Sequence, residues 1–252
     1  MKKDLIFLGA LWLILSWLSP IFAVDTTNAT LPAVGTKDVI GHVEGVKIDV
    51  LVQSPSAQVT PLQIVCLFEY QEGDIYNSPP ALPKALNGLV HVDESLGGLI
   101  TDLRKSKKFE GKSLETLLIT PPAGKLKADK LLLIGLGHRD DFKPEMMRMI
   151  GVTGMREALR LGVKSYSHAS DLKDAGISSP TAEVAYYVVQ GALEAYRTQK
   201  YLKEMHDSEA LTVNNLTLLS GPAYFEDTKG GIRRALENAS ENSEQKLQMQ
   251  GK

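Results

Sequence analysis

The fold of this chain is decided by the stretch from residue 130 to residue 166, which begins Lys130-Leu131-Leu132-Leu133-Ile134-Gly135-Leu136-Gly137. Its apolar start predicts a buried strand, and the two glycines allow a tight turn after it. Beyond Pro144, apolar and small residues recur at helical spacing up to Gly162, namely Met147, Ile150, Gly154, Ala158 and Leu161. With Val163–Tyr166 as the next strand, the stretch predicts a strand-helix-strand unit.

Further strands and helices alternate on both sides of this unit. Strands are predicted over Val46–Gln53, with one covered face, over Leu62–Phe68, in a central position, and over Thr116–Thr120 and Leu211–Leu219. Helices are predicted over 83–87 and 94–105, and from about Pro180 with Ser179 as the cap. This alternation predicts an α/β fold with a mainly parallel or mixed sheet that is covered on both faces.

The two ends of the chain differ from its middle. Two lysines, the apolar run Leu5–Leu18 and the segment Ile21-Phe22-Ala23 have the layout of a secretory signal peptide. The run is shorter than a membrane-spanning helix requires. We therefore expect residues 1–23 to be removed after Ala23, and the protein to be periplasmic or secreted. Residues 24–44 are expected to form a flexible arm, 45–225 a single domain, and 226–252 a polar helical tail that frays or awaits a partner.

Composition narrows the classes of partner. The 28 basic and 30 acidic residues leave a net charge of −2, which gives no general attraction to nucleic acid or to anionic lipid. Cys66 is the only cysteine of the chain and lies in an apolar run, so it cannot form an internal disulfide and is expected to be a buried core residue. A reactive thiol is the alternative, although no neighbouring residue would lower its pKa.

Two glycine motifs resemble phosphate-binding turns, and both are incomplete. Gly111-Lys112-Ser113 resembles the end of a P-loop, but Ser106 stands where that motif needs a glycine. Gly135-Leu136-Gly137 follows a strand and precedes a helix, as in a dinucleotide-binding turn, but the third glycine is absent. Glycines that shape turns are the simpler interpretation. A ligand pocket formed by Gly135, Gly137 and His138 at this carboxyl edge is the alternative.

No catalytic, cofactor-binding or metal-binding residue is predicted. The five histidines, His42, His91, His138, His168 and His206, are scattered without an H-E-x-x-H pair or companion cysteines. Zinc needs three or four ligands that lie close together, and this spacing offers none. The G-x-S-x-G elbow that presents a serine nucleophile is also missing from the sequence.

The stretch from His91 to Leu202 resembles the N-terminal domain of the M17 leucyl aminopeptidase family. The resemblance rests on the stretches Asp93–Ile100, Phe109–Lys112 with Glu115-Thr116, Lys130–Gly137, Gly151–Gly162 and Val189–Tyr196, in that order. It implies a macro-like α/β domain with a central mixed sheet between helices, in which the glycine motifs shape turns. Leu114 departs from the pattern, because the family usually has glycine at this position, and the departure puts the conformation of that turn in doubt.

In the family, catalysis depends on a second, C-terminal domain in which two divalent metals activate a water molecule. The signature of that domain is not found in this sequence. The resemblance therefore implies a stand-alone, non-catalytic N-terminal domain that acts as an interaction or regulatory module. Its partner would be another exported protein, such as a peptidase, or a second copy of itself. Binding of a nucleotide-like ligand is one alternative, and association with an aminopeptidase without activity of its own is another. No cofactor, nucleic acid or lasting membrane anchor is expected.

Overall fold

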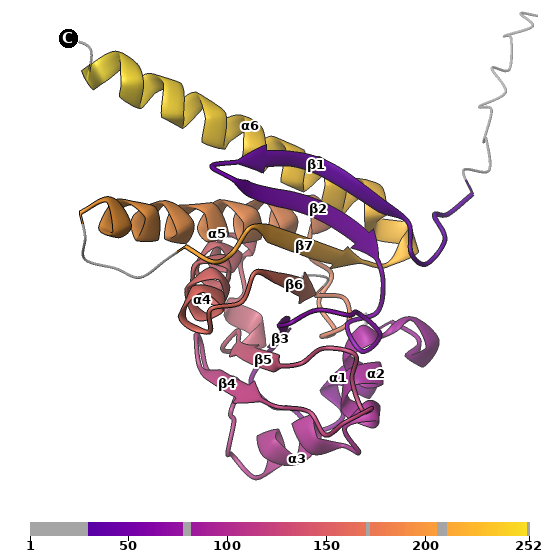
Figure 1. The fold of residues 1–252 in the computed structure, drawn as a ribbon. Helices are drawn as coiled ribbons and strands as arrows, with labels where there is room; N and C mark the ends of the chain where they lie inside the picture. Colours follow the sequence, from indigo (N-terminus) through magenta and orange to yellow (C-terminus); the bar gives the residue numbers. More distant parts are fainter. Residues whose placement is uncertain (1–29, 78–81, 170–171, 206–210, 251–252) are drawn as a thin grey trace, which may run out of the picture. The chain divides into compact units, whose positions relative to one another are not determined.

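A computed structural model describes residues 30–77, 82–169, 172–205 and 211–250, and a seven-stranded sheet lies at the centre of this part (Figure 1). The strands are β1 (Lys37–Val43), β2 (Val46–Val52), β3 (Gln63–Leu67), β4 (Thr116–Ile119), β5 (Leu131–Gly135), β6 (Ser165–Ala169) and β7 (Asn215–Ser220). They lie in the order β1-β2-β7-β6-β3-β5-β4. Only the pairs β1–β2 and β4–β5 are antiparallel. The predicted α/β class, with a mixed and mostly parallel sheet, is confirmed.

The inner strands are covered on both faces. All five residues of β3 are buried, and β3 lies between β6 and β5, as its lack of polar positions predicted. In β2 every residue except Lys47 is buried, so the prediction of one covered face was wrong. The prediction placed Asp49 on an open face because its side chain is charged. In the structure Asp49 is wholly buried, and its carboxylate lies 3.0 Å from Nζ of Lys37. A paired carboxylate can be buried in this way, and alternation of residue types does not reveal it.

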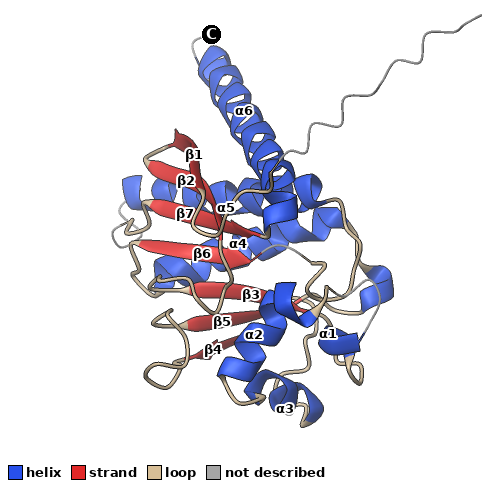
Figure 2. Ribbon diagram, turned by 90° about the vertical axis from the view of Figure 1, so that its right-hand side faces the viewer, coloured by secondary structure: helices blue, strands red, loops and turns tan. Residues whose placement is uncertain are grey.

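Helices cover both faces of the sheet (Figure 2). Three short ones follow β3, namely α1 (Asp74–Asn77), α2 (Gly88–Ser95) and α3 (Leu99–Lys105). On the opposite face lie α4 (Met147–Arg160), α5 (Thr181–Glu204) and α6 (Phe225–Gln250). Single 3₁₀ turns occur at Lys84–Leu86, Arg139–Asp141, Pro144–Met146 and Pro222–Tyr224. None of the helices in the described residues is long and apolar enough to span a membrane, and the predicted signal peptide lies outside those residues.

Glycines set the close approach of the three long helices. A Cβ atom added to Gly151 of α4 would lie 2.1 Å from the carbonyl oxygen of Val188, in α5. A Cβ atom on Gly191 would similarly lie 1.9 Å from the carbonyl oxygen of Arg148, and one on Gly231 2.1 Å from that of Ala182. Such distances are far below contact distance. The backbones of α4, α5 and α6 can therefore approach each other this closely only because these positions carry no side chain.

Both ends of the described chain are more ordered than their composition indicated. Residues 37–43 of the expected arm form β1, which pairs with β2 and contacts α6. The expected tail is part of α6, whose residues Ile232 and Ala235 are buried against the rest of the domain. Small and apolar residues at helical spacing supply this contact, although the segment is polar overall. The boundary predicted at residues 225 and 226 therefore does not separate a tail from the domain.

Several element boundaries also differ from expectation. The helix predicted over 94–105 is two helices, α2 and α3, because Gly97 and Gly98 adopt left-handed conformations with φ of 70° and 85°. Pro180, and not Ser179, is the cap residue of α5, and the Ser179 carbonyl accepts a hydrogen bond from Lys173 Nζ instead. The last strand begins at Asn215 and not at Leu211. Each difference lies at an element end, where local contacts outweigh average propensity.

Candidate ligand site at the carboxyl edge of the sheet

The P-loop-like turn binds one of the chain's own carboxylates. The backbone N–H groups of Glu110, Gly111 and Lys112 donate to the Glu115 carboxylate, at 3.0, 2.8 and 3.1 Å from its Oε2. Successive N–H groups in such a turn form a concave anion-binding site. Because Glu115 fills it, this turn stabilises the fold and presents no open phosphate site. Leu114 closes the turn in a left-handed conformation, with φ of 62°, which explains why glycine suits this position.

The predicted pocket residues Gly135, Gly137 and His138 lie beside the same turn. A Cβ atom on Gly135 would be 1.9 Å from the Lys112 carbonyl oxygen, and Gly137 N donates to the Gly111 carbonyl at 2.9 Å. His138 is half-exposed, with Nδ1 3.9 Å from the Asp140 carboxylate. The structure thus brings both glycines against the Gly111 turn. None of the three residues lines the carboxyl-edge cavity described below, and a ligand site at these three residues stays a prediction.

Asp93, in the first family-like stretch, also serves the backbone. Its side chain is wholly buried, and Oδ1 accepts hydrogen bonds from the N–H groups of Ile100 and Thr101 at the start of α3. Its Oδ2 accepts from the Tyr76 hydroxyl at 3.0 Å. Burial, together with the Asp93 charge, raises the pKa of Tyr76 to about 12. Asp93 therefore caps α3 from the neighbouring helix and connects it to α1.

A buried ion cluster joins the loops at the carboxyl ends of β3 and β5. Arg104 donates from both Nη atoms to the Asp74 carboxylate, and also to the Phe68 carbonyl at 2.6 Å. Arg139 lies 3.3 Å from the same carboxylate and donates to the Ala175 carbonyl. The pairs are 30 and 65 positions apart in sequence, so no local motif indicates this cluster. Through Arg139, the cluster connects the loop that contains Ala175 to the segments that follow β3 and β5.

Cys66 and His168 form a second polar contact, inside the core. Cys66 Sγ lies 4.0 Å from His168 Nε2, and both side chains are buried. Burial raises the pKa of the Cys66 thiol, which keeps it protonated and unreactive. Burial also lowers the pKa of His168 to about 4, so the imidazole is neutral at pH 7. The expectation of a buried core cysteine is confirmed.

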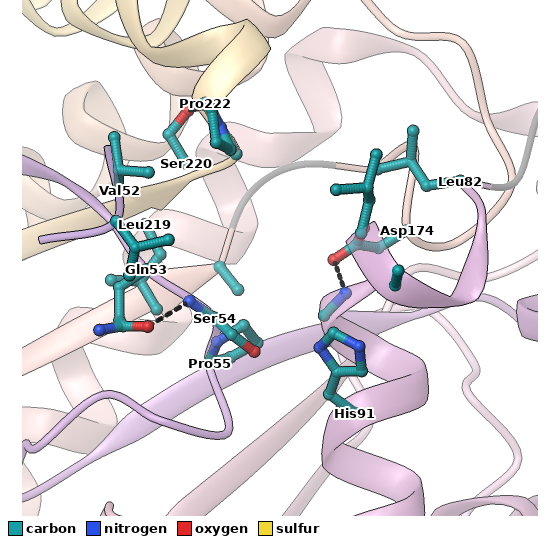
Figure 3. A pocket seen from close by; sticks show the side chains of 16 residues that line it. Val52, Gln53, Ser54, Pro55, Leu82, His91, Asp174, Leu219, Ser220 and Pro222 are labelled. Atoms are coloured by element: carbon teal, nitrogen blue, oxygen red, sulfur yellow. Dashed lines mark hydrogen bonds between the residues drawn. The ribbon is translucent and has the colours of Figure 1, made fainter. Parts of the chain in front are cut away.

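A cavity opens where β2, β7 and β6 end (Figure 3). Val52, Leu219 and Ala169, at the carboxyl ends of these strands, form one wall. Leu82 and Leu86, in the segment that precedes α2, line it from another element. The hollow encloses about 690 Å³ when the open space at its mouth is included. Its position at the carboxyl edge of parallel strands is where open α/β sheets bind ligands.

The polar groups of this cavity surround the first turn of α2. The N–H of Gly88 donates to Asp174 Oδ2 at 2.9 Å, and the N–H of Val90 donates to Asn87 Oδ1 at 3.1 Å. The Asn87 side chain also donates to the Asp174 carbonyl at 3.1 Å. His91, one turn further along α2, lies beside this network and lines the cavity (Figure 3). The amino end of α2 is therefore already capped by side chains of the protein.

No sequence motif indicates this site, because its walls come from five separate parts of the chain. As for metals, the described residues hold no group of three or more His, Cys, Asp or Glu side chains placed to bind an ion.

Known proteins match both the sequence and the fold. The sequence profile of the cytosol aminopeptidase family, N-terminal domain, matches residues 75–204, which is more than half of the chain. The chain belongs to the cytosol aminopeptidase family. A probable cytosol aminopeptidase of Alkaliphilus oremlandii is 35% identical over 120 residues, which cover 47% of this chain and 23% of that relative. The chain thus matches less than a quarter of the length of this family member.

Solved structures agree with the macro-like fold. A mutant of the leucine aminopeptidase of tomato, 19% identical, superposes with a TM-score of 0.50 over 74% of this chain and 35% of its own. The Oceanobacillus iheyensis macrodomain solved with ADP, 12% identical, superposes with a TM-score of 0.51 over 81% of this chain and 98% of its own. The M17 resemblance and the macro-like fold are therefore confirmed for this member of the cytosol aminopeptidase family.

Proposed function

We propose that this domain is a non-catalytic, exported module of the aminopeptidase family that acts by contact with another protein, of which a peptidase of the same family is the leading candidate. The observation behind this proposal is the exposed end of α5. Tyr201 and Met205 are 61% and 54% exposed there, and Tyr201 lines a hollow between α5 and α6. Exposed aromatic and methionine side chains beside a groove are typical of protein-binding surfaces.

The chemistry of the family stretches supports a role without catalysis. The carboxylates of Asp93 and Glu115, two acidic residues of these stretches, are both hydrogen bonded to backbone N–H groups. They act as caps within the fold, and a capping carboxylate is not available as a metal ligand or as a general base. The curated relatives are several times longer than the segment they share with this chain, so a domain of this kind sits beside further protein in those relatives.

Complex formation with a family peptidase is the direct test. The purified protein would be mixed with an M17 aminopeptidase of its own cell and analysed by size-exclusion chromatography with light scattering. We expect a stoichiometric complex. The double variant Tyr201→Glu, Met205→Glu should weaken it at least tenfold, about 1.4 kcal/mol. The matched control is Val59→Glu, because Val59 is 77% exposed and lies on the loop between β2 and β3. Persistence of separate species at concentrations near 100 μM, roughly the weak limit of specific association, would contradict the partner proposal.

Activity and export have tests of their own. The purified protein should release no leucine from a chromogenic amide when manganese or zinc is added, and measurable turnover would refute the non-catalytic role. For export, the mature protein from the exported fraction should begin at Val24 when its amino terminus is sequenced. Recovery of the intact Met1 form from the cytoplasm alone would count against it.

Binding of a small ligand is a second candidate function. It is favoured by the cavity at the carboxyl ends of β2, β7 and β6, and by the fold shared with a macrodomain that was solved with ADP. The two candidates are compatible, because the cavity and the hollow at Tyr201 have no lining residue in common.

A further inference from the structure

We propose that the carboxyl-edge cavity binds an uncharged, ring-bearing compound of the nucleoside class and discriminates against phosphorylated forms of it. This inference deepens the second candidate function and is independent of the peptidase partner. It concerns the cavity lined by Val52, Leu219, Leu86 and His91, and it rests on the shape of that cavity, on its charges and on its unpaired polar groups.

The shape favours a flat apolar body. Side chains at the strand ends, including Val52 and Leu219, provide an apolar surface on one side. Leu82 and Leu86 supply apolar contacts from the segment before α2. Leu86 is 61% exposed in the structure, so much of its side chain is available for contact with a ligand. A ring system placed among these side chains would remove apolar surface from water on both of its faces, which contributes roughly 25 cal/mol per Å².

The charges disfavour phosphate. The described residues that line the cavity include no lysine and no arginine, and the one carboxylate among them is that of Asp174. The amino end of a helix often binds phosphate through free N–H groups. At α2 the N–H groups of Gly88 and Val90 are already bonded to Asp174 and Asn87. A phosphate in this cavity would therefore meet the Asp174 carboxylate, with no lysine or arginine among the described lining residues to balance its charge.

The unpaired polar groups suit the heteroatoms of such a ring. The side chain of His91 makes no hydrogen bond or ion pair with any described residue, and His91 is partly buried at the cavity wall. The side-chain amide of Gln53 uses its oxygen to accept from Ser54 N, while its NH₂ group has no partner in the described chain. These groups supply hydrogen bonds for the nitrogen and hydroxyl groups of a nucleoside without requiring a charge on it.

Adenosine and ADP are matched probes, because they share the ring and the sugar and differ in the phosphates. Each would be titrated into the purified protein at constant ionic strength, with binding followed by calorimetry and by the shifts of NMR signals. We expect adenosine to bind at least tenfold more tightly than ADP. Tighter or equal binding of ADP would overturn the charge argument. Absence of adenosine binding at about 1 mM, a Kd too weak for a built site, would overturn the assignment of the ligand class.

Substitutions locate the ligand and test the role of Asp174. Leu86→Glu should weaken adenosine binding at least tenfold, whereas Leu31→Glu should not, because Leu31 is equally exposed and does not line the cavity. Asp174→Asn should narrow the difference between adenosine and ADP, because it removes the one lining carboxylate. Thermal unfolding checks that each variant is folded. Wild-type adenosine affinity in Leu86→Glu would refute the location, and an unchanged difference in Asp174→Asn would refute the electrostatic cause.

Failure of these tests leaves the peptidase-partner proposal intact, because complex formation is measured without adenosine or ADP. Conversely, adenosine binding by a protein that forms no complex would retain the ligand site and exclude the partner. The two proposals can therefore fail separately.

Discussion

Acidification should destabilise this protein by favouring protonation of His168, a buried residue of β6 that packs against α4. The imidazole is wholly buried, its Nδ1 has no hydrogen-bond partner, and its Nε2 lies 4.0 Å from the Cys66 sulfur. A Cβ atom placed on Gly154 of α4 would lie 3.8 Å from Cδ2 of the ring. No described carboxylate contacts the ring, so a proton on it would be a buried charge without compensation.

The magnitude follows from the two pKa values of this side chain. Burial lowers the pKa of His168 from 6.5 to about 4 in the folded state. The stability that depends on the neutral ring is therefore fully present above pH 6.5 and is lost as the pH falls toward 4, because the unfolded chain binds the proton first. Between pH 7.5 and pH 5 this group alone should reduce the free energy of unfolding by about 2 kcal/mol.

Urea unfolding followed by far-ultraviolet circular dichroism, at several pH values from 7.5 to 5, measures this effect. The range stops at pH 5 because carboxylates with ordinary pKa values near 4 titrate below it. His168→Leu removes the titrating group, so its stability should fall about 2 kcal/mol less over this range than that of the wild type. His42→Gln, an exposed substitution in β1, is the control. If His168→Leu retained the full pH dependence, burial of this ring would not be its cause.

Three further substitutions test the packing, each by the same urea unfolding at pH 7.5. Gly231→Ala should destabilise by about 1–3 kcal/mol, because the new Cβ would lie 2.1 Å from the Ala182 carbonyl oxygen, whereas Gly230→Ala in the same helix meets nothing within 4 Å and should stabilise by about 0.5–1 kcal/mol. Equal effects would contradict the close crossing of α5 and α6. Leu114→Gly should stabilise by up to about 1 kcal/mol, since it relieves a left-handed residue that is 39% exposed; a loss of stability would mean that the Leu114 side chain matters more than its backbone strain. Asp74→Ala should cost about 3–5 kcal/mol by leaving the buried Arg104 without its partner carboxylate, and a cost below about 1 kcal/mol would refute that pairing.

Much of the fold could be read from local pattern. The strand predicted over Val46–Gln53 is β2, which ends one residue earlier at Val52, and the helix predicted after Pro144 is α4, from Met147 to Arg160. Both have a strong period and clear boundaries, so neighbouring residues decide their conformation. The stretches that resemble the M17 family also predicted the fold correctly, and the structure shows what their residues do in it. Asp93 and Glu115 cap backbone groups, and Gly135 allows the close approach of the Gly111 turn.

The candidate site could not be read in this way. Val52, Leu86, Asp174 and Leu219 are far apart in the sequence, and none of them stands in a motif. They meet because β2, β6 and β7 are adjacent and parallel, so that the three carboxyl ends share one edge of the sheet. The polar composition of β1 and α6 led to the wrong prediction of an arm and a tail for a related reason. Polar residues of these elements face outward, while a small set of small and apolar residues contacts the rest of the domain.

By itself, the sequence determined the elements, the family and the α/β class, since these depend on residue spacing within a few turns of helix or strand. Only the tertiary structure decided the strand order, the close crossing of the long helices, the ion cluster at Asp74 and the cavity at the carboxyl edge. These features depend on contacts between residues that the chain brings together only after its strands have paired. Side chains distant in sequence carry no periodic signal of such contacts, because each contact is a property of two surfaces and not of either segment alone.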